Sequence, residues 1–144
     1  MKAVSLHRPW AELIACELKC IETRDWLSLP KCLLGQRIAI HAAKRIDETA
    51  VERIRRDTGI NVSAVALSPG GCIVATARVH AVEWLDGSPY EVFRALCACR
   101  YLVGIHLTDV RRVRPPRPFR GHQRIFNVPD DLLLPCPRNP QPGT

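Results

Sequence analysis

The feature that most constrains the fold is a pair of long segments in which apolar and polar residues alternate. Residues 72–84 carry apolar side chains at every second position from Ile73 to Ala81, and three of the five are alanine. Residues 100–113 show the same alternation. A period of two is typical of a strand with one buried face, and small side chains suit the crowded interior of a small barrel. The sequence therefore predicts two long strands in a curved sheet.

Shorter segments complete the expected order of elements. Strands separated by small helices predict an α+β, mainly β protein: a mixed β-barrel of five to six strands with about three short helices. We expect residues 1–130 to form one domain and the Pro-rich residues 131–144 to be a flexible tail. The remaining expected elements are strands 2–6, 21–26, 37–42 and 124–128, helices 9–18, 47–59 and 88–97, and loops 60–71 and 114–121.

Two of the expected helices carry recognisable ends. Asp47 is the expected N-cap of helix 47–59, and Gly59 stands where a C-terminal cap belongs. The sequence Ser88-Pro89-Tyr90-Glu91 has the form of a capping box, with proline at the first helical position.

The charge of the chain points to a polyanionic partner. Lys and Arg number 21 against 14 Asp and Glu, a net charge of +7, and residues 110–129 hold six arginines and no acid. Such a stripe favours nucleic acid as a partner. A solvated surface is the alternative, since a chain rich in arginine and poor in lysine can reflect GC-rich coding. The arginines of this basic stripe are Arg111, Arg112, Arg114, Arg117, Arg120 and Arg124.

The sequence indicates a cytoplasmic protein without a bound metal. No apolar run approaches the roughly 18–20 residues that span a bilayer, and the first residues lack the apolar stretch of a signal peptide. The seven cysteines are odd in number and lack zinc-ribbon spacing. We expect reduced, mostly buried thiols, no metal, no cofactor and no membrane.

Lys19, Glu22 and Arg24 form the densest group of candidate functional residues. If residues 20–26 are a strand, Glu22 and Arg24 share one face, and Lys19 can reach over it from the preceding turn. A carboxylate held between cations can accept from a base or ribose, while the cations take a phosphate. A surface ion-pair ladder has the same spacing and is the alternative.

These residues also carry a resemblance to a known family. Residues 2–6, residues 8–11 and Lys19-x-x-Glu22-x-Arg24 resemble the start of an ASCH domain (activating-signal-cointegrator homology), whose signature is G-x-K-x-x-E-x-R. Three later blocks agree in order, so the resemblance runs from residue 2 to about 129. These blocks are Ile40–Lys44, Gly71–Ala77 and Gly121–Val128.

The resemblance implies a PUA-like β-barrel with a cleft that suits RNA or a modified nucleoside. Lys19, Glu22 and Arg24 match the signature, but Glu17 replaces its leading glycine, which leaves the turn before Lys19 open. With the basic stripe, the expected ligand-binding residues are Ser5, Trp10, Lys19, Glu22, Arg24, His41, Lys44, Gln123 and Arg124.

Several of these residues have a purely structural alternative. Trp10 can pack in the core, and Lys44 can be solvated. The Ser5 hydroxyl can bind the start of the first helix. Gln123 and Arg124 can simply close the barrel.

Three functions remain open at this stage. The first is a non-catalytic RNA-binding or nucleoside-binding module. The second is an amidohydrolase for acetylcytidine, which some small ASCH proteins imply, with Lys19 and Glu22 as catalytic residues. In that subgroup a threonine lies three residues after the lysine, where this chain has Glu22, and Thr23 is expected on the opposite strand face. The third is an interaction module for an acidic protein.

Overall fold

Six strands form one curled, mixed sheet in the computed structural model, which describes residues 1–133. The strand order is β2-β5-β4-β3-β1-β6; β1 and β3 are parallel, and the other neighbours are antiparallel. β2 and β6 are the two edges, so the sheet curls without closing. The predicted mainly β, α+β class is confirmed. The strands are β1 Lys2–Arg8, β2 Ile21–Arg24, β3 Arg37–Ile46, β4 Cys72–Trp84, β5 Val103–Pro118 and β6 Ile125–Asn127.

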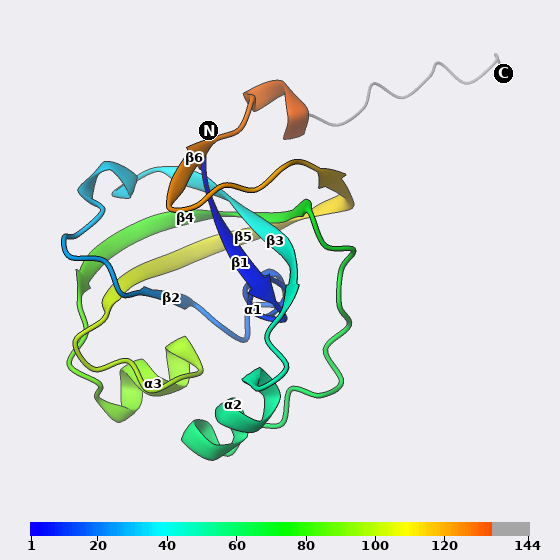
Figure 1. Ribbon diagram of the computed structural model, residues 1–144. Helices are drawn as coiled ribbons and strands as arrows, with labels where there is room; N and C mark the ends of the chain where they lie inside the picture. Colours follow the sequence, from blue (N-terminus) through cyan, green and yellow to red (C-terminus); the bar gives the residue numbers. More distant parts are fainter. Residues whose placement is uncertain (134–144) are drawn as a thin grey trace, which may run out of the picture.

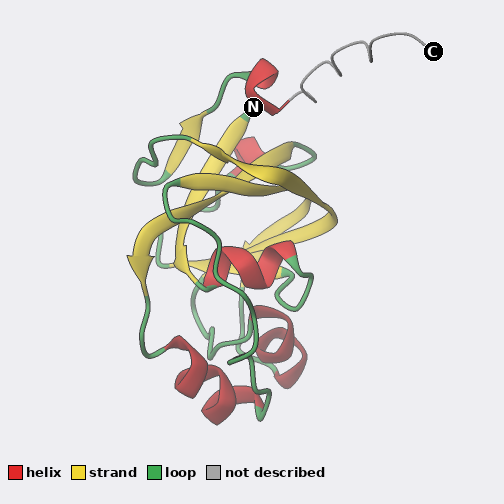
Figure 2. Ribbon diagram, turned by 90° about the vertical axis from the view of Figure 1, so that its right-hand side faces the viewer, coloured by secondary structure: helices red, strands yellow, loops and turns green. Residues whose placement is uncertain are grey.

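Three α-helices lie on the connections, and Figures 1 and 2 show α2 and α3 gathered at one end of the sheet. Leu13 of α1, Ile54 of α2 and Leu96, next after α3, are all buried in one apolar cluster that joins the helices. Burial of shared apolar surface therefore holds the helices together beside the strands. The helices are α1 Trp10–Ala15, α2 Ala50–Thr58 and α3 Pro89–Ala95, with short 3-10 helices η1 Lys31–Leu33 and η2 Asp130–Leu133.

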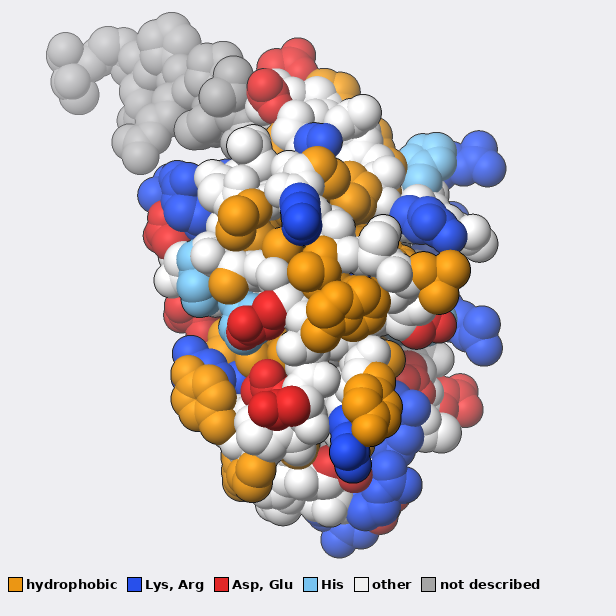
Figure 3. All heavy atoms as spheres, turned by 90° about the vertical axis from the view of Figure 1, so that its left-hand side faces the viewer, with side chains coloured by type: hydrophobic (Ala, Val, Ile, Leu, Met, Phe, Trp, Pro, Cys, Tyr) orange, Lys and Arg blue, Asp and Glu red, His pale blue; other side chains and the backbone are white. Residues whose placement is uncertain are grey.

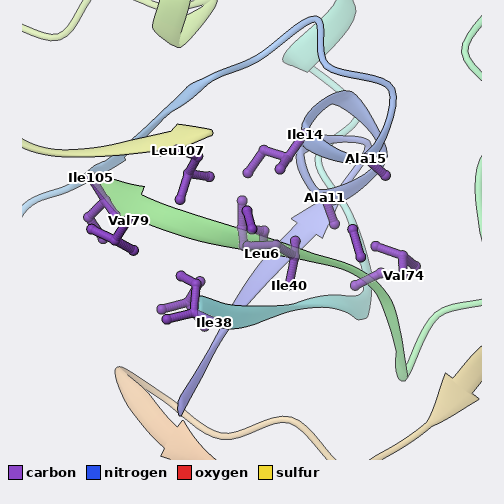
Figure 4. Close-up of a cluster of buried hydrophobic side chains, with 14 of the residues drawn as sticks. Leu6, Ala11, Ile14, Ala15, Ile38, Ile40, Val74, Val79, Ile105 and Leu107 are labelled. Atoms are coloured by element: carbon purple, nitrogen blue, oxygen red, sulfur yellow. The ribbon is translucent and has the colours of Figure 1, made fainter. Parts of the chain in front are cut away.

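The core fills the concave side of the sheet beneath α1. In Figure 4 the side chains of Leu6, Ile14, Ile40 and Leu107 point toward one another between α1 and the strands.

Of the five β4 residues expected on one face, Ala75, Ala77 and Val79 are fully buried in this core. Ile73, on the other side of a bulge, packs in a second cluster, and Ala81 is half-buried, so the predicted alternation holds only in the middle of the strand.

β5 is longer at its C-terminal end than the sequence predicts. Residues 114–118 were expected in a loop because of their prolines, but β5 continues to Pro118, opposite Cys72. A bulge between Ile73 and Ala75 leaves the middle of this segment unpaired. β2 covers only the first residues of β5, so the prolines lie at a bulge and on an edge, where a missing N–H is tolerated.

Other element ends also differ by a few residues from expectation. The first helix ends at Ala15 and β5 begins at Val103. Gly59 ends α2 with φ 77° and Ser88 accepts from Glu91 N at 3.3 Å, so two of the three predicted caps are confirmed. The N-cap of α2 is Thr49 instead of Asp47.

The cysteines of the described part of the chain are free thiols. Cys72 and Cys99 are buried, Cys32 is exposed and the other three are half-buried, so fewer are buried than expected. Burial raises the pKa of the Cys99 thiol to about 11 and keeps it protonated. Residues 1–133 contain no helix with the length and hydropathy that a membrane crossing requires. Residues 134–144, most of the expected tail, lie outside the described residues.

The turn that ends α1 has a defined geometry although Glu17 replaces the signature glycine there. Glu17 has a left-handed backbone conformation, with φ 65°. Leu18 N–H donates to Leu13 O at 3.0 Å, and Glu17 N–H donates to Ile14 O at 2.9 Å. These are the two hydrogen bonds of a Schellman motif. Glu17 thus adopts the conformation that glycine would supply, and the chain turns toward Lys19.

This geometry predicts that Glu17→Gly stabilises the protein by about 1 kcal/mol. The left-handed conformation costs a residue with a Cβ about 1–2 kcal/mol, and the greater freedom of glycine in the unfolded chain offsets part of the gain. Urea unfolding followed by tryptophan fluorescence measures the change. Glu17→Ala is the control, because it keeps the Cβ. Equal stabilities of the two variants would contradict this explanation.

Candidate functional site

The ASCH-like signature opens into a cavity of about 420 Å³, which we name the Glu22 cavity. Residues of β1, α1, β2 and α2 and the segment after α3 line it. Its volume lies in the range of small-molecule sites, roughly 300–1,000 Å³. Five expected site residues come together here: Ser5, Trp10, Lys19, Glu22 and Arg24.

Lys19 lines the Glu22 cavity but is almost fully buried. Its side chain is 1% exposed, and its Nζ donates to Ala95 O, the last carbonyl of α3. The same Nζ lies 3.8 Å from Glu22 Oε1 and 5.0 Å from the centre of the Trp10 ring. A cation at a helix C-terminus is favourable because the terminal carbonyls carry partial negative charge. Lys19 therefore joins α3 to β2.

Glu22 is the buried acceptor at the centre of the cavity. Its Oε1 accepts from Thr23 N–H at 2.9 Å, and its Oε2 lies 3.3 Å from Arg24 Nη2. The same Nη2 donates to Ser5 O at 2.8 Å. The carboxylate is thus fixed from both sides, and Arg24 ties β2 to β1.

Trp10 forms a wall whose orientation depends on Asp47. Trp10 Nε1 donates to Asp47 Oδ2 at 3.1 Å, and Arg53 Nη2 approaches the same oxygen at 3.1 Å. Burial would raise the pKa of Asp47, but hydrogen bonds from Thr49 and Trp10 outweigh it and lower the pKa. Asp47, which was expected as a helix N-cap, instead orients the Trp10 ring and the Arg53 guanidinium.

A second hollow of about 1130 Å³ lies beside the first, and we name it the His41 groove. His41 is 2% exposed; its Nε2 lies 2.7 Å from Phe119 O, and its Nδ1 lies 2.8 Å from Ser5 Oγ. A carbonyl only accepts, so Nε2 carries the proton, and Nδ1 of a neutral ring accepts from the Ser5 hydroxyl. His41 therefore acts here by holding its neighbours in place.

The remaining expected residues divide among several surfaces. Lys44, Arg120, Gln123 and Arg124 line the His41 groove. Arg112 and Arg114 line a third hollow of about 360 Å³, where Arg112 Nε donates to Ala15 O at 3.2 Å. Arg111 pairs with Asp109 at 3.0 Å, and Arg117 is half-buried. Figure 3 likewise shows basic side chains at separate places on one face.

Sequence reasoning missed the contribution of α2 and its surroundings. Arg53 and Arg56, one turn apart on α2, line the Glu22 cavity. Their i, i+3 spacing marks a shared helix face, but only the packing of α2 brings that face to the signature. Thr23 also lines the cavity, with its Oγ1 3.7 Å from Cys97 Sγ, although it alternates with Glu22 along β2.

The described residues hold no cluster of three His, Cys, Asp or Glu side chains that would fit a metal ion. The chemistry of the site is that of a fixed carboxylate, a serine–histidine pair and several arginines. These groups suit hydrogen bonding to a base or sugar, and pairing with phosphate.

Comparison with solved structures decides the fold. No protein-family model matches the sequence, and neither does any curated protein. The crystal structure of ASCH from Zymomonas mobilis is similar, with a TM-score of 0.58 and 17% identity over 91% of this chain and 89% of that one. This chain has the ASCH fold. A serine-to-alanine variant of that protein has a TM-score of 0.58 and 16% sequence identity over 91% of this chain and 89% of that one. A tyrosine-to-phenylalanine variant has a TM-score of 0.54 and 16% identity over 91% of each chain.

The ASCH fold confirms the resemblance drawn from the sequence blocks. Lys19, Glu22 and Arg24 line one cavity together with Trp10 of α1, and their part in binding stays a prediction. The ASCH signature glycine is replaced, but its turn is kept by Glu17.

Buried His41 and half-buried His106 predict that acid destabilises the protein. Burial lowers the pKa of His41, although the hydrogen bond to Phe119 opposes this, and burial also lowers the pKa of His106. The unfolded chain therefore binds protons more readily, so stability is complete above about pH 6.5 and falls below it. The loss is at most about 1.4 kcal/mol per pH unit and histidine.

Urea unfolding at pH 7, 6 and 5 measures this dependence. His41→Asn removes one of the two titrating groups, so its stability should change less steeply with pH than that of the unaltered protein. Parallel slopes for the two proteins would show that His41 contributes nothing to the effect.

Proposed function

We propose that the protein binds one nucleotide of an RNA in the Glu22 cavity. The observation that carries this proposal is a fixed carboxylate, Glu22, set in a cavity whose rim carries Arg53 and Arg56. The other acid in its lining, Asp57, pairs with Arg56 at 3.1 Å. An amino or imino group of a base can donate to the carboxylate, while the rim arginines can pair with a phosphate. The free thiols of the described residues support the cytoplasm as the compartment.

The carboxylate retains room for a ligand. An ionised carboxyl has about four lone-pair sites, and Thr23 N–H, Lys19 Nζ and Arg24 Nη2 approach three of them. These three contacts leave acceptor capacity on the carboxylate for a donor of the ligand. Because the other contacts already fix the carboxylate, a ligand that pairs with it loses little side-chain entropy on binding.

Trp10 and Arg53 supply the apolar and cationic sides of the same space. The guanidinium of Arg53 lies 5.9 Å from the centre of the Trp10 ring, a distance at which cation and ring attract each other. A flat base can stack on such a surface without sequence preference. Selectivity would then come from Glu22 and affinity from the arginines.

The arginines of α2 offer a matched test. Arg53 and Arg56 line the cavity, whereas Arg55 pairs with Glu52 at 2.7 Å on the exposed side of the helix. We expect Arg53→Ala with Arg56→Ala to weaken binding of single-stranded RNA about tenfold, and Arg55→Ala to change it less than twofold. Fluorescence anisotropy at 50 and 200 mM salt measures both, and binding should weaken as salt rises.

Equal loss in the α2 double variant and in Arg55→Ala would show that the charge of the helix matters and the cavity does not. Failure of the unaltered protein to bind RNA at 50 mM salt would refute the proposal. An acidic protein partner, the remaining alternative for the charged surface, would then be the function to test.

An amidohydrolase is the second candidate, because Thr23 lines the cavity together with Lys19 and Glu22. The position of Lys19 speaks against it: the Nζ that would act on substrate contacts Ala95 O, Glu22 and the Trp10 ring, and the side chain is 1% exposed. In this reading Lys19 positions Glu22 and does not touch the ligand.

We therefore expect acetylcytidine to remain intact when it is incubated with the protein. Chromatography of the products measures any release of cytidine. Release that is abolished in both Lys19→Ala and Thr23→Val would establish the hydrolase instead. Release that persists in both variants would point to a contaminating enzyme.

A further inference from the structure

The Glu22 cavity and the His41 groove share one wall. Ser5, His7 and Arg24 line both hollows. The wall is rigid, because Arg24 Nη2 donates to Ser5 O, and the Ser5 hydroxyl donates to buried His41. A ligand seated on Glu22 can therefore continue past Arg24 into the groove along this shared wall.

The groove has the charge that a polyanion requires. Lys44 of β3 and Arg120 and Arg124 of the segment after β5 face it together with Arg24, and Asp25 is the one acid among its described lining residues. Four cations against one carboxylate give the groove a positive potential, which attracts the phosphates of a polyanion. The excess is local, since Arg111 and Arg112 of the basic stripe lie elsewhere.

The segment that presents these cations is fixed in place. Phe119 O accepts from His41, and the Phe119 ring stacks on Phe126 of β6 at 6.1 Å. A Cβ at Gly121 would lie 2.5 Å from His41 Cε1 and 3.1 Å from Ser5 Oγ, so only glycine lets the segment approach this closely. Binding a ligand here does not require ordering a loose loop.

The size of the groove indicates more than one nucleotide unit. At about 1130 Å³ it is larger than the Glu22 cavity at about 420 Å³. It also exceeds the roughly 1,000 Å³ at the upper end of small-molecule sites. A free nucleoside would occupy the smaller hollow and leave the larger, more basic one empty.

We propose that the ligand is a single RNA strand, with one nucleotide in the Glu22 cavity and the adjoining sugar-phosphate backbone in the His41 groove. The inference rests on the proposed function of the Glu22 cavity and extends it from one nucleotide to a strand. The cavity selects the nucleotide, and Lys44, Arg120 and Arg124 hold its neighbours through their phosphates.

The test compares a strand with a mononucleotide. A fluorescent RNA hexanucleotide and cytidine monophosphate are titrated against the unaltered protein and against Lys44→Ala with Arg120→Ala. We expect this double variant to weaken hexanucleotide binding about tenfold more than binding of the mononucleotide. The slope of log affinity against log salt for the hexanucleotide should fall by about 1.4, because each lost phosphate contact on a single strand accounts for about 0.7.

Arg45→Ala with Arg55→Ala is the matched control. It removes the same charge from exposed positions that line neither hollow, and Arg45 neighbours Lys44 in β3. Less than a twofold change is expected for both ligands. An equal loss of hexanucleotide binding in the two double variants would refute the proposed role of the groove, since net charge alone would then explain the binding.

The remaining outcomes separate this inference from the proposed function. If Lys44→Ala with Arg120→Ala binds the hexanucleotide normally while Arg53→Ala with Arg56→Ala does not, the groove is refuted and the cavity stands. If the unaltered protein binds neither ligand, both fail. If polyglutamate displaces the hexanucleotide at equal concentration, the groove is a site for an acidic protein instead.

Discussion

The burial of one ammonium group governs how the helical end of this protein is built. Lys19 is nearly without solvent contact, so its charge has to be met by the protein: by the last carbonyl of α3, by Glu22 of β2 and by the face of Trp10 at the start of α1. Removing one partner would leave a buried charge uncompensated, which typically costs several kcal/mol. These contacts fix α1, α3 and the edge strand β2 relative to one another, and the Glu22 cavity is the space that this arrangement leaves.

The charged groups around the Glu22 cavity differ in how firmly they are held and how exposed they are. The buried acceptor is surrounded by contacts that prevent it from moving, whereas the arginines at the rim remain accessible. Preorganised acceptors discriminate between ligands, and exposed cations add affinity that depends on salt. His41 plays the corresponding part in the groove, where it couples Ser5 of β1 to Phe119 and so fixes a distant segment against the sheet.

Alternation and capping signals were enough to predict the strands, the three helices and the fold class, because these features are set by residues close in sequence. Glu22 and Arg24 were expected on one strand face with Lys19 reaching over it, and the three line one cavity, while their role in binding stays a prediction. Three features depend on tertiary packing and were not predictable. β5 continues through its prolines, and Asp47 accepts a hydrogen bond from Trp10 where a helix N-cap was expected. The packing of α2 also brings Arg53 and Arg56 to the cavity of Glu22. The basic stripe looked continuous in sequence, but alternation along β5 and its bulge distribute it over several surfaces.

The pairing of β1 with β6 has a consequence for how the protein forms during synthesis. Ala3 lies opposite Phe126, and β1 also pairs in parallel with β3, so β1 meets β6 only after residues 125–127 have been synthesised, long after β3. Contacts between residues so far apart in sequence close slowly, because a long loop must be ordered first. Until then one edge of β1 has no hydrogen-bonding partner, and a nascent chain at this stage is a natural client for chaperones.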